Sequence, residues 1–420
     1  MKQKLNTALC AFLLLCSTAF GSGFQINEHG ARAMAMGGAF TAAALDPSIL
    51  YFNNAGITQM SGFKLMMGST LIAPSSTFRG VSPKVNETKM ESQLFTPIHF
   101  YATYEITDQI YAGLGFNNPF GLGTKWPSAW DGRFVSLEIA VETYNLNPVI
   151  AYKINDNLSI GVGLQYAFGN VLINKDIKIP SAYLGETIAN VDMNGDATSA
   201  MGFTAGLMYK TDCNLTFGVN YRSEVKFDFT GSAKSTGGSS LAASSLPSGD
   251  ITASLTTPQQ LVVGVSYQYD EKLLLSTDFQ WVGWSSYDTL KVNFTSSNTS
   301  SAAPRLYENN YAIRFGANYK YCKDIDFSAG LLYDKNPVKD QFVDATLPDA
   351  DRLGFSVGAG YKVMDNLSVD VSYLFLRMFE RTITNSMVSS VTYDPNNTLP
   401  FNGTYNSTAN LFSLSLSYNL

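Results

Sequence analysis

The sequence predicts an all-β protein, a transmembrane β-barrel of fourteen antiparallel strands whose lumen holds an N-terminal plug, or hatch. Apolar and polar residues alternate over about ten residues at a time, which predicts strands that cross a membrane with one face toward lipid. Tyrosines recur near the ends of these stretches, where barrel strands carry aromatic residues at the membrane interfaces. Only 15% of the residues are charged, against about 25% in ordinary soluble domains, while 13% are aromatic.

Residues 1–21 have the pattern of a secretory signal peptide. Lys2 and Lys4 precede an apolar core, and the small residues Ala19 and Gly21 occupy the cleavage-site positions. We therefore expect an exported protein whose mature chain begins at Ser22.

Cleavage between Gly21 and Ser22 can be tested by the intact mass of the protein extracted from the membrane. We expect the mass of residues 22–420, because this cut places small residues at both required positions and frees the Ser-Gly-Phe terminus. A chain that retained Cys16 with an attached lipid would contradict this expectation.

Residues 22–61 do not alternate and are rich in alanine, glycine and methionine, above all between Ala31 and Ala44. A fourteen-stranded barrel has a lumen that stays open unless something fills it. We therefore predict three parts: the signal peptide, a plug at 22–61 and the barrel at 62–420.

The barrel strands are marked by alternation and by six short turns, each of which follows a tyrosine. At the C-terminus, for example, Phe412, Leu414 and Leu416 alternate with serines. Six turns join twelve strands, and one more strand at each end, near 62–73 and at 410–420, gives the even number of a closed barrel. Soluble β-sandwiches also alternate, but their strands are usually shorter, about 5–6 residues. The turns follow Tyr104, Tyr152, Tyr209, Tyr267, Tyr319 and Tyr361, and we expect the longer connections to be extracellular loops at about 75–90, 118–139, 173–194, 231–254, 295–306, 335–350 and 381–407.

Composition also narrows the function. The net charge of −6 disfavours nucleic-acid binding. Only two histidines are present, His29 and His99, and neither belongs to a spacing typical of a nucleophile, zinc or phosphate site. We therefore expect no catalytic residue, no metal and no cofactor, and a protein that is not an enzyme. After signal cleavage only Cys213 and Cys322 remain, which leaves one disulfide bridge and two free thiols both open.

Several motifs along the mature chain resemble those of the FadL family of outer-membrane transporters for long-chain fatty acids and hydrocarbons. This resemblance implies a bacterial outer-membrane protein, surrounded by lipid and folded by the barrel assembly machinery. The chain departs from the family in the plug motif Asn53, Asn54 and Ala55, where Asn54 replaces the usual proline. The motifs are Ser22–Glu28, Asn53–Gly56, Asn117–Leu122, Trp130–Arg133, Tyr144–Pro148, Trp281–Ser286 and Leu347–Arg352.

The resemblance implies passive uptake of a hydrophobic compound, which is captured in a barrel pocket and released sideways through the wall. Lateral release suits such a ligand, because each CH₂ group gains about 0.8 kcal/mol on leaving water. The expected lateral gate is the kink at Asn117, Asn118, Pro119, Phe120 and Gly121, since proline lacks the N–H that a strand ladder needs. From the residues alone, an ordinary strand-to-loop turn fits this segment equally well.

The resemblance also implies three ligand-binding residues, Phe24, Ile173 and Lys175, with Lys175 holding a carboxylate. A second basic residue of the family falls on Glu308, while the nearby Arg305 and Arg314 cannot be assigned. Neutral hydrocarbons therefore remain an alternative ligand. Two other functions also remain open: a plugged structural or adhesin barrel without transport, and a general diffusion porin for polar solutes.

Overall fold

The computed structural model describes residues 23–181, 185–237, 246–389 and 400–420. The predicted signal peptide and Ser22 lie outside the described residues.

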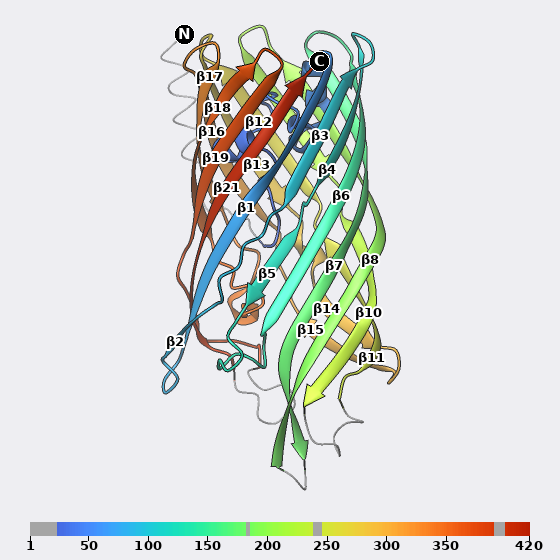
Figure 1. Cartoon of the computed structure of the whole chain (residues 1–420), viewed down its shortest axis with the longest axis vertical. Helices are drawn as coiled ribbons and strands as arrows, with labels where there is room; N and C mark the ends of the chain where they lie inside the picture. The colour runs from blue at the N-terminus through green and yellow to red at the C-terminus, as the bar shows by residue number, and fades with distance from the viewer. Residues whose placement is uncertain (1–22, 182–184, 238–245, 390–399) are drawn as a thin grey trace.

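The described part of the chain forms a closed barrel of fourteen antiparallel wall strands, several of which are interrupted and so consist of two segments (Figure 1). The first and last strands close it, paired from Lys64 opposite Asn419 to Gly80 opposite Gly403. The fourteen-stranded fold is thus confirmed. The segments are β1 (Phe63–Gly80), β2 (Glu87–Lys89), β3 (Ile98–Glu105), β4 (Ile110–Asn117), β5 (Gly121–Lys125), β6 (Glu138–Lys153), β7 (Leu158–Ser181), β8 (Gly185–Lys210), β9 (Leu215–Arg222), β10 (Val225–Gly237), β11 (Gly249–Thr257), β12 (Gln260–Gln268), β13 (Leu273–Val282), β14 (Thr289–Phe294), β15 (Thr299–Pro304), β16 (Asn310–Lys320), β17 (Ile325–Asp334), β18 (Arg352–Met364), β19 (Leu367–Met378), β20 (Arg381–Ile383) and β21 (Gly403–Asn419).

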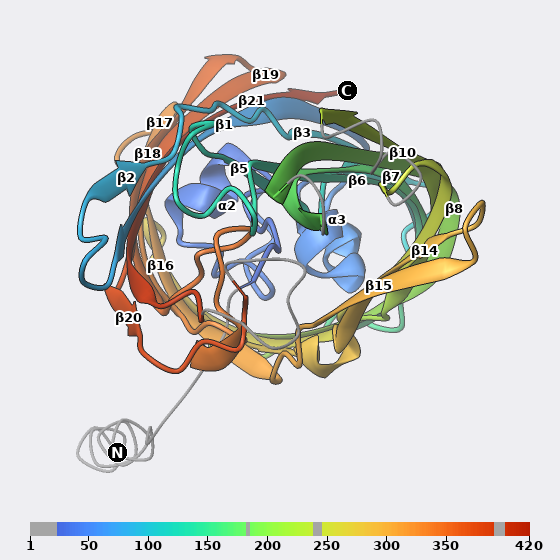
Figure 2. The same cartoon turned by 90° about the horizontal axis from the view of Figure 1, so that it is seen from below.

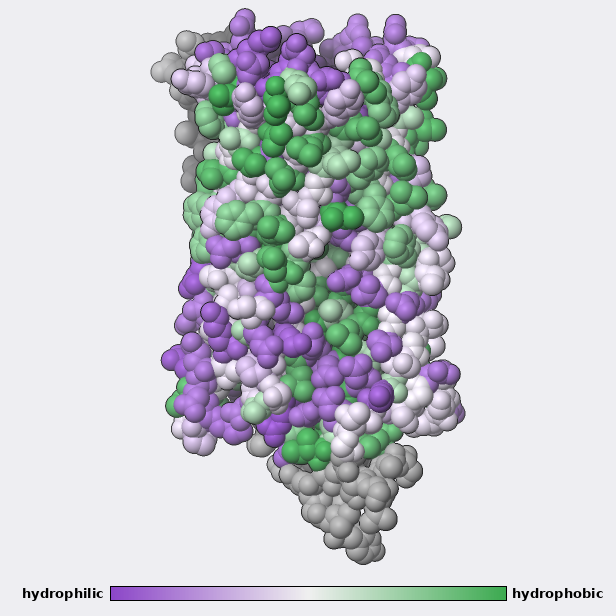
Figure 3. Space-filling model, viewed as in Figure 1, coloured by the Kyte–Doolittle hydropathy of each residue, from purple (hydrophilic) through white to green (hydrophobic). Residues whose placement is uncertain are grey.

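The alternation sorts side chains between the two faces of the wall as predicted. In β21, Phe412 is 54% exposed on the outside, while the adjacent Ser413 is buried on the inside. Hydrophobic residues gather on the outer surface in the half of the barrel that holds the short turns, and hydrophilic residues cover much of the other half (Figure 3). This belt is what a lipid-facing barrel surface requires.

Two expected loops, at 173–194 and 231–254, are in large part strand. The long strands β7 and β8 pair from Leu158 opposite Tyr209 to Ser181 opposite Gly185, well beyond the ends of their neighbours. The physical reason is continued inward alternation, because apolar side chains in this region pack together across four neighbouring segments. The cluster consists of Val191, Met193, Ala233, Ile251, Val292 and Phe294, with Ile173, Ile177 and Ala253 against it.

Residues 23–61, here called the luminal segment, lie inside the ring of strands (Figure 2). Their short helices are α2 (Ala31–Ala35), α3 (Ile49–Phe52) and the 3₁₀ helix η1 (Asn54–Gln59). Arg32 ties the segment to the wall through Asp326 at 2.9 Å and Asp370 at 2.8 Å. A second attachment is to β13, where the Asp278 carboxylate accepts hydrogen bonds from the backbone N–H groups of Phe40 and Thr41.

The Asn53-Asn54-Ala55 motif packs directly on the barrel wall. The Asn53 side chain accepts from the Ala55 N–H at 3.1 Å and donates to the carbonyl of Leu207 at 3.0 Å. The buried Asn54 side-chain amide lies between the Leu50 carbonyl and the Thr204 hydroxyl, and its nitrogen can donate to that carbonyl at 3.0 Å, whereas a proline at this position could not donate. Gly206 permits this approach, because a Cβ there would lie 2.3 Å from the Asn53 amide oxygen.

Cys213 and Cys322 are exposed free thiols in the turns after β8 and β16. In the described part of the chain, no helix has both the length and the apolar character to cross a membrane.

Candidate functional site

The third wall strand is interrupted at the expected kink. Segment β4 pairs with β3 as far as Asn117 opposite His99, and β5 resumes at Gly121, paired with β6 alone. Within the described residues, no backbone hydrogen bond joins positions 118–124 to positions 92–98. The ladder of the wall is therefore open over this stretch.

Two side chains hold the kink where ladder bonds are missing. Asn118 accepts from the Ile98 N–H at 2.9 Å and donates to the Thr143 carbonyl at 2.9 Å. The Thr143 hydroxyl accepts from the Phe120 N–H at 3.0 Å and donates to the Phe120 carbonyl at 2.7 Å. Thr143 is a site residue for which the sequence carries no local signal.

The N-terminal residues of the luminal segment pair with the kink from inside the barrel. The Ile26 N–H donates to the Pro119 carbonyl at 2.9 Å, and the Gly121 N–H donates to the Phe24 carbonyl at 3.0 Å. The kink therefore forms backbone hydrogen bonds with the start of the luminal segment instead of with the neighbouring residues 92–98 of the wall.

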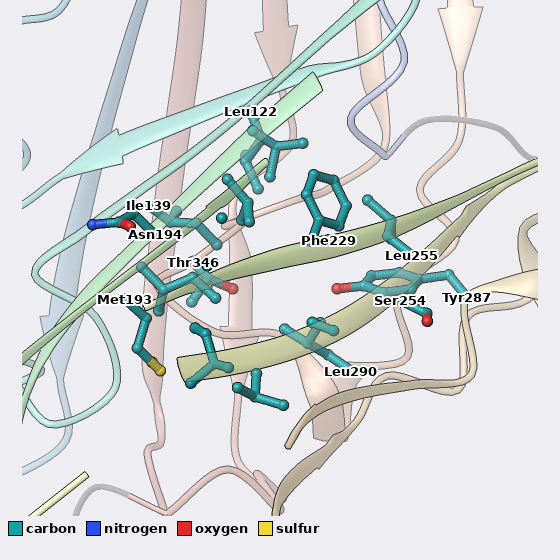
Figure 4. Close-up of a pocket in the computed structure, with 18 of the residues that line it drawn as sticks. Leu122, Ile139, Met193, Asn194, Phe229, Ser254, Leu255, Tyr287, Leu290 and Thr346 are labelled. Atoms are coloured by element: carbon teal, nitrogen blue, oxygen red, sulfur yellow. The ribbon is translucent and has the colours of Figure 1, made fainter. Parts of the chain in front are cut away.

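An apolar cavity lies between Phe24 and the extended parts of β7, β8, β10 and β11. Figure 4 shows Phe229, Leu255, Leu290 and Tyr287 facing one another around it. Almost all of its surface is hydrocarbon, so it suits an apolar ligand. Much of this lining was not predicted from the sequence because the region was expected to be loop. The signal was the alternation of apolar with polar residues, seen where Asp192 separates Val191 from Met193 and again around Phe229, Ile251 and Leu255.

A second, larger cavity lies at the interruption of the wall and is lined by residues of the kink. Leu94 and Ile98 at its rim are 61% and 47% exposed, so apolar side chains border the opening. Four residues line both cavities and form the septum between them: Phe24, Leu122, Val141 and Leu347.

Phe24 is held more firmly than its place near a chain end suggests. Its ring makes edge contacts with Trp284 at 4.8 Å, Tyr287 at 5.7 Å and Phe120 at 5.9 Å between centroids. Only 5% of its surface is exposed. Three aromatic rings and the backbone pairing with the kink together hold Phe24 in place.

The two other predicted ligand residues lie on one face of β7. Ile173 lines the apolar cavity, and Lys175 follows two residues further along the same face. Lys175 makes no hydrogen bond or ion pair with the described residues, although Arg305 and Asp344 act on its charge. Glu308 points elsewhere, because it pairs with Lys339 at 3.1 Å and is exposed. Arg305, which could not be assigned from the sequence, lines the cavity instead.

Arg305 is the buried cation of the cavity wall. Its guanidinium donates to the Asp344 carboxylate at 2.8 Å, while its Nε atom is buried without a partner in the described structure. Burial alone lowers the pKa of Arg305, but the Asp344 carboxylate outweighs burial and the net pKa is raised. Burial also raises the pKa of Tyr307 and Tyr287, so both phenols beside Arg305 are neutral.

No group of three or more histidine, cysteine or carboxylate side chains that could hold a metal ion occurs in the described ranges. The arrangement can bind an apolar molecule and hold an anionic end.

Comparisons with known proteins agree with this architecture. The long-chain fatty acid transport protein of Escherichia coli K12 is 27% identical over 419 residues, which cover 90% of this chain and 93% of that protein. Outer membrane protein P1 of Haemophilus influenzae is 25% identical over 466 residues and covers 99% of both chains.

Solved structures show the same fold. A FadL homologue from Pseudomonas aeruginosa is similar with a TM-score of 0.81 at 20% identity, covering 96% of this chain and 100% of that one. The toluene transporter TodX of P. putida has a TM-score of 0.73 at 17% identity, covering 93% and 98%. The model of the outer membrane protein transport protein family (OMPP1/FadL/TodX) matches residues 12–420. The chain therefore belongs to this family and is a β-barrel protein of the bacterial outer membrane.

Proposed function

We propose that this protein takes up hydrophobic molecules passively across the outer membrane. A single observation carries the proposal: an apolar cavity inside the barrel is separated by a thin septum from a second cavity at a break in the wall. The relatives named above as transporters of long-chain fatty acids and of toluene support this class of ligand. A ligand bound in the first cavity would cross the septum and leave through the break.

The charges at the cavity favour a long-chain fatty acid over a neutral hydrocarbon. Lys175 and Arg305 bring two positive charges, and Asp344 brings one negative charge. One positive charge, that of the partly buried Lys175, is therefore left without a counter-ion among these three groups, and removing an unpaired charge from water is costly. The carboxylate of a fatty acid supplies the missing negative charge, and the chain fills the apolar cavity lined by Ile173.

The remaining parts have supporting roles in this proposal. The segment at 22–61 acts as a plug that keeps polar solutes out, with Asn53, Asn54 and Ala55 anchoring it to the wall. The kink at 117–121 is the lateral gate, because its backbone makes no ladder bonds to the described residues 92–98 and apolar side chains border the gap. Membrane lipid receives the released ligand, and the barrel assembly machinery inserts the protein. No catalysis is involved.

The replacement of Lys175 by alanine tests the head-group assignment. We expect weaker binding of hexadecanoic acid by about tenfold, since a hydrogen bond to a charged group contributes about 1.5–3 kcal/mol, and unchanged binding of its methyl ester. Both ligands are measured with the full mature protein in lipid nanodiscs. Lys178→Ala, three residues further along β7 and therefore on its opposite face, away from the cavity, is the matched control.

An equal loss for the acid and the ester would show that Lys175 does not read the head group. A structural or adhesin barrel without transport would bind neither compound, and a polar diffusion porin would show a large open-channel conductance.

A further inference from the structure

The loop between β17 and β18 contacts the Arg305 side chain, the septum and the start of the luminal segment, which all belong to the proposed transport route. Its residue Asp344 pairs with Arg305, and its residue Leu347 forms part of the septum. Further along, the Asp349 carboxylate accepts a hydrogen bond from the Gly23 N–H at 3.0 Å, next to Phe24. We call residues 344–349 the coupling loop.

The coupling loop is also bonded to the strand that follows the kink. The Trp126 indole N–H donates to the Ala345 carbonyl at 2.9 Å, and the Thr124 hydroxyl lies 3.2 Å from the same oxygen. Thr124 belongs to β5, and Trp126 follows directly after that segment. A displacement of the loop would therefore disturb the septum, the N-terminus and the free edge of the kink together.

The Asp344 carboxylate is held in place at both of its oxygens. One oxygen accepts from Arg305 at 2.8 Å, and the other accepts from the N–H of Thr346 at 2.8 Å and from its hydroxyl. The side chain is 7% exposed and that of Arg305 is 10% exposed. Asp344 thus occupies on Arg305 the place that a carboxylate ligand needs.

We infer that Asp344 is an internal substitute for the ligand head group and that its displacement couples binding to release; this rests on the function proposed above. An incoming fatty acid competes with Asp344 for Arg305, assisted by the charge of Lys175, which forms no ion pair with the described residues. Once Asp344 is released, the coupling loop loses its attachment to the cavity and Leu347 leaves the septum. A neutral ligand lacks this effect, because it has no charge with which to displace Asp344.

The experiment compares hexadecanoic acid and its methyl ester in wild type and Asp344→Asn, with the full mature chain in nanodiscs for binding and in liposomes for transfer into lipid. In wild type we expect the acid to be transferred faster than the ester. In Asp344→Asn we expect the acid to bind about tenfold more tightly, because its competitor has lost its charge, and the ester to be transferred at nearly the rate of the acid.

Asp340→Asn is the matched control, because Asp340 lies in the same connection and pairs with Arg381 at 2.7 Å but is exposed. Asp340→Asn should change neither the binding nor the transfer of either ligand. Thr346→Val removes the hydroxyl that donates to the Asp344 carboxylate but leaves the charge of Asp344 in place. We expect tighter binding of the acid and faster transfer of the ester, both to a smaller extent than in Asp344→Asn. Thr346→Val carries the test if Asp344→Asn does not assemble into a heat-stable barrel.

The outcomes separate the two proposals. An unchanged ester transfer rate in Asp344→Asn refutes the coupling, and unchanged or weaker binding of the acid refutes the competition. Equal losses for acid and ester give Asp344 a merely structural role and overturn the inference. If wild type itself transfers neither compound, the proposed function fails before any variant is considered.

Discussion

Straightening the kink should abolish uptake of hydrophobic compounds while the barrel still folds. Replacing Asn118, Pro119 and Phe120 with Thr-Val-Thr offers the backbone a continuous alternating strand that can pair with residues 92–98. Closing the ladder there removes the opening that borders the larger cavity, so the lateral exit is lost. We expect uptake of hexadecanoic acid by whole cells to fall to the level of cells without the protein.

The uptake measurement needs two controls. The first shows that the straightened variant still folds into a heat-stable barrel, and the second shows the effect of replacing a proline elsewhere in the wall. Pro148→Val serves as the second, because Pro148 lies within β6, opposite Leu114, where the ladder with β4 is unbroken. It should leave uptake unchanged. Ligand affinity is measured on the straightened variant as well, because Phe120 and the kink backbone also hold Phe24, and a loss of binding has to be separated from a closed exit. Persistent uptake in a folded, straightened barrel would rule out the lateral gate.

Pro148 also shows the limit of the sequence argument for the kink. Pro74 and Pro148 both lie inside paired strands, so a proline does not by itself predict a broken wall. What distinguishes the kink is the set of side-chain bonds from Asn118 and Thr143, and the N-terminus that pairs with it from inside. These contacts join residues far apart in the chain, and no local pattern encodes them.

Regular alternation, in contrast, predicted the barrel well because each strand must expose one face to lipid and bury the other. The expected strands ended too early at the far ends of β7 and β8, because residues such as Asn190 and Asp192, which alternate with the buried Val191 and Met193, are polar and do not suit lipid. Those strands persist because inward-facing residues pack on β10 and β11. The cavity lining and the role of Arg305 went unrecognised for that reason.

Removal of the Phe24 ring should affect every ligand, whatever its head group. Phe24 forms part of the septum and borders both cavities, while the charged groups of the site lie elsewhere in the wall. In Phe24→Ala we expect hexadecanoic acid and its methyl ester to bind more weakly by the same factor, about tenfold, because full burial of a phenylalanine contributes about 1.5–3 kcal/mol.

The control for Phe24→Ala is Phe227→Ala, because Phe227 is equally buried in the same apolar cluster but lines neither cavity. It should lower the thermal stability of the barrel without changing either affinity, since the loss of a buried ring costs about 3–5 kcal/mol of folding free energy. Phe24→Ala should also make transfer of the bound ester faster, because the two cavities then join and the ester no longer waits for the septum to open. If Phe24→Ala weakened binding of the acid alone, Phe24 would lie beside the head group rather than in the path of the ligand's hydrocarbon chain. The septum would then consist of Leu122, Val141 and Leu347 alone.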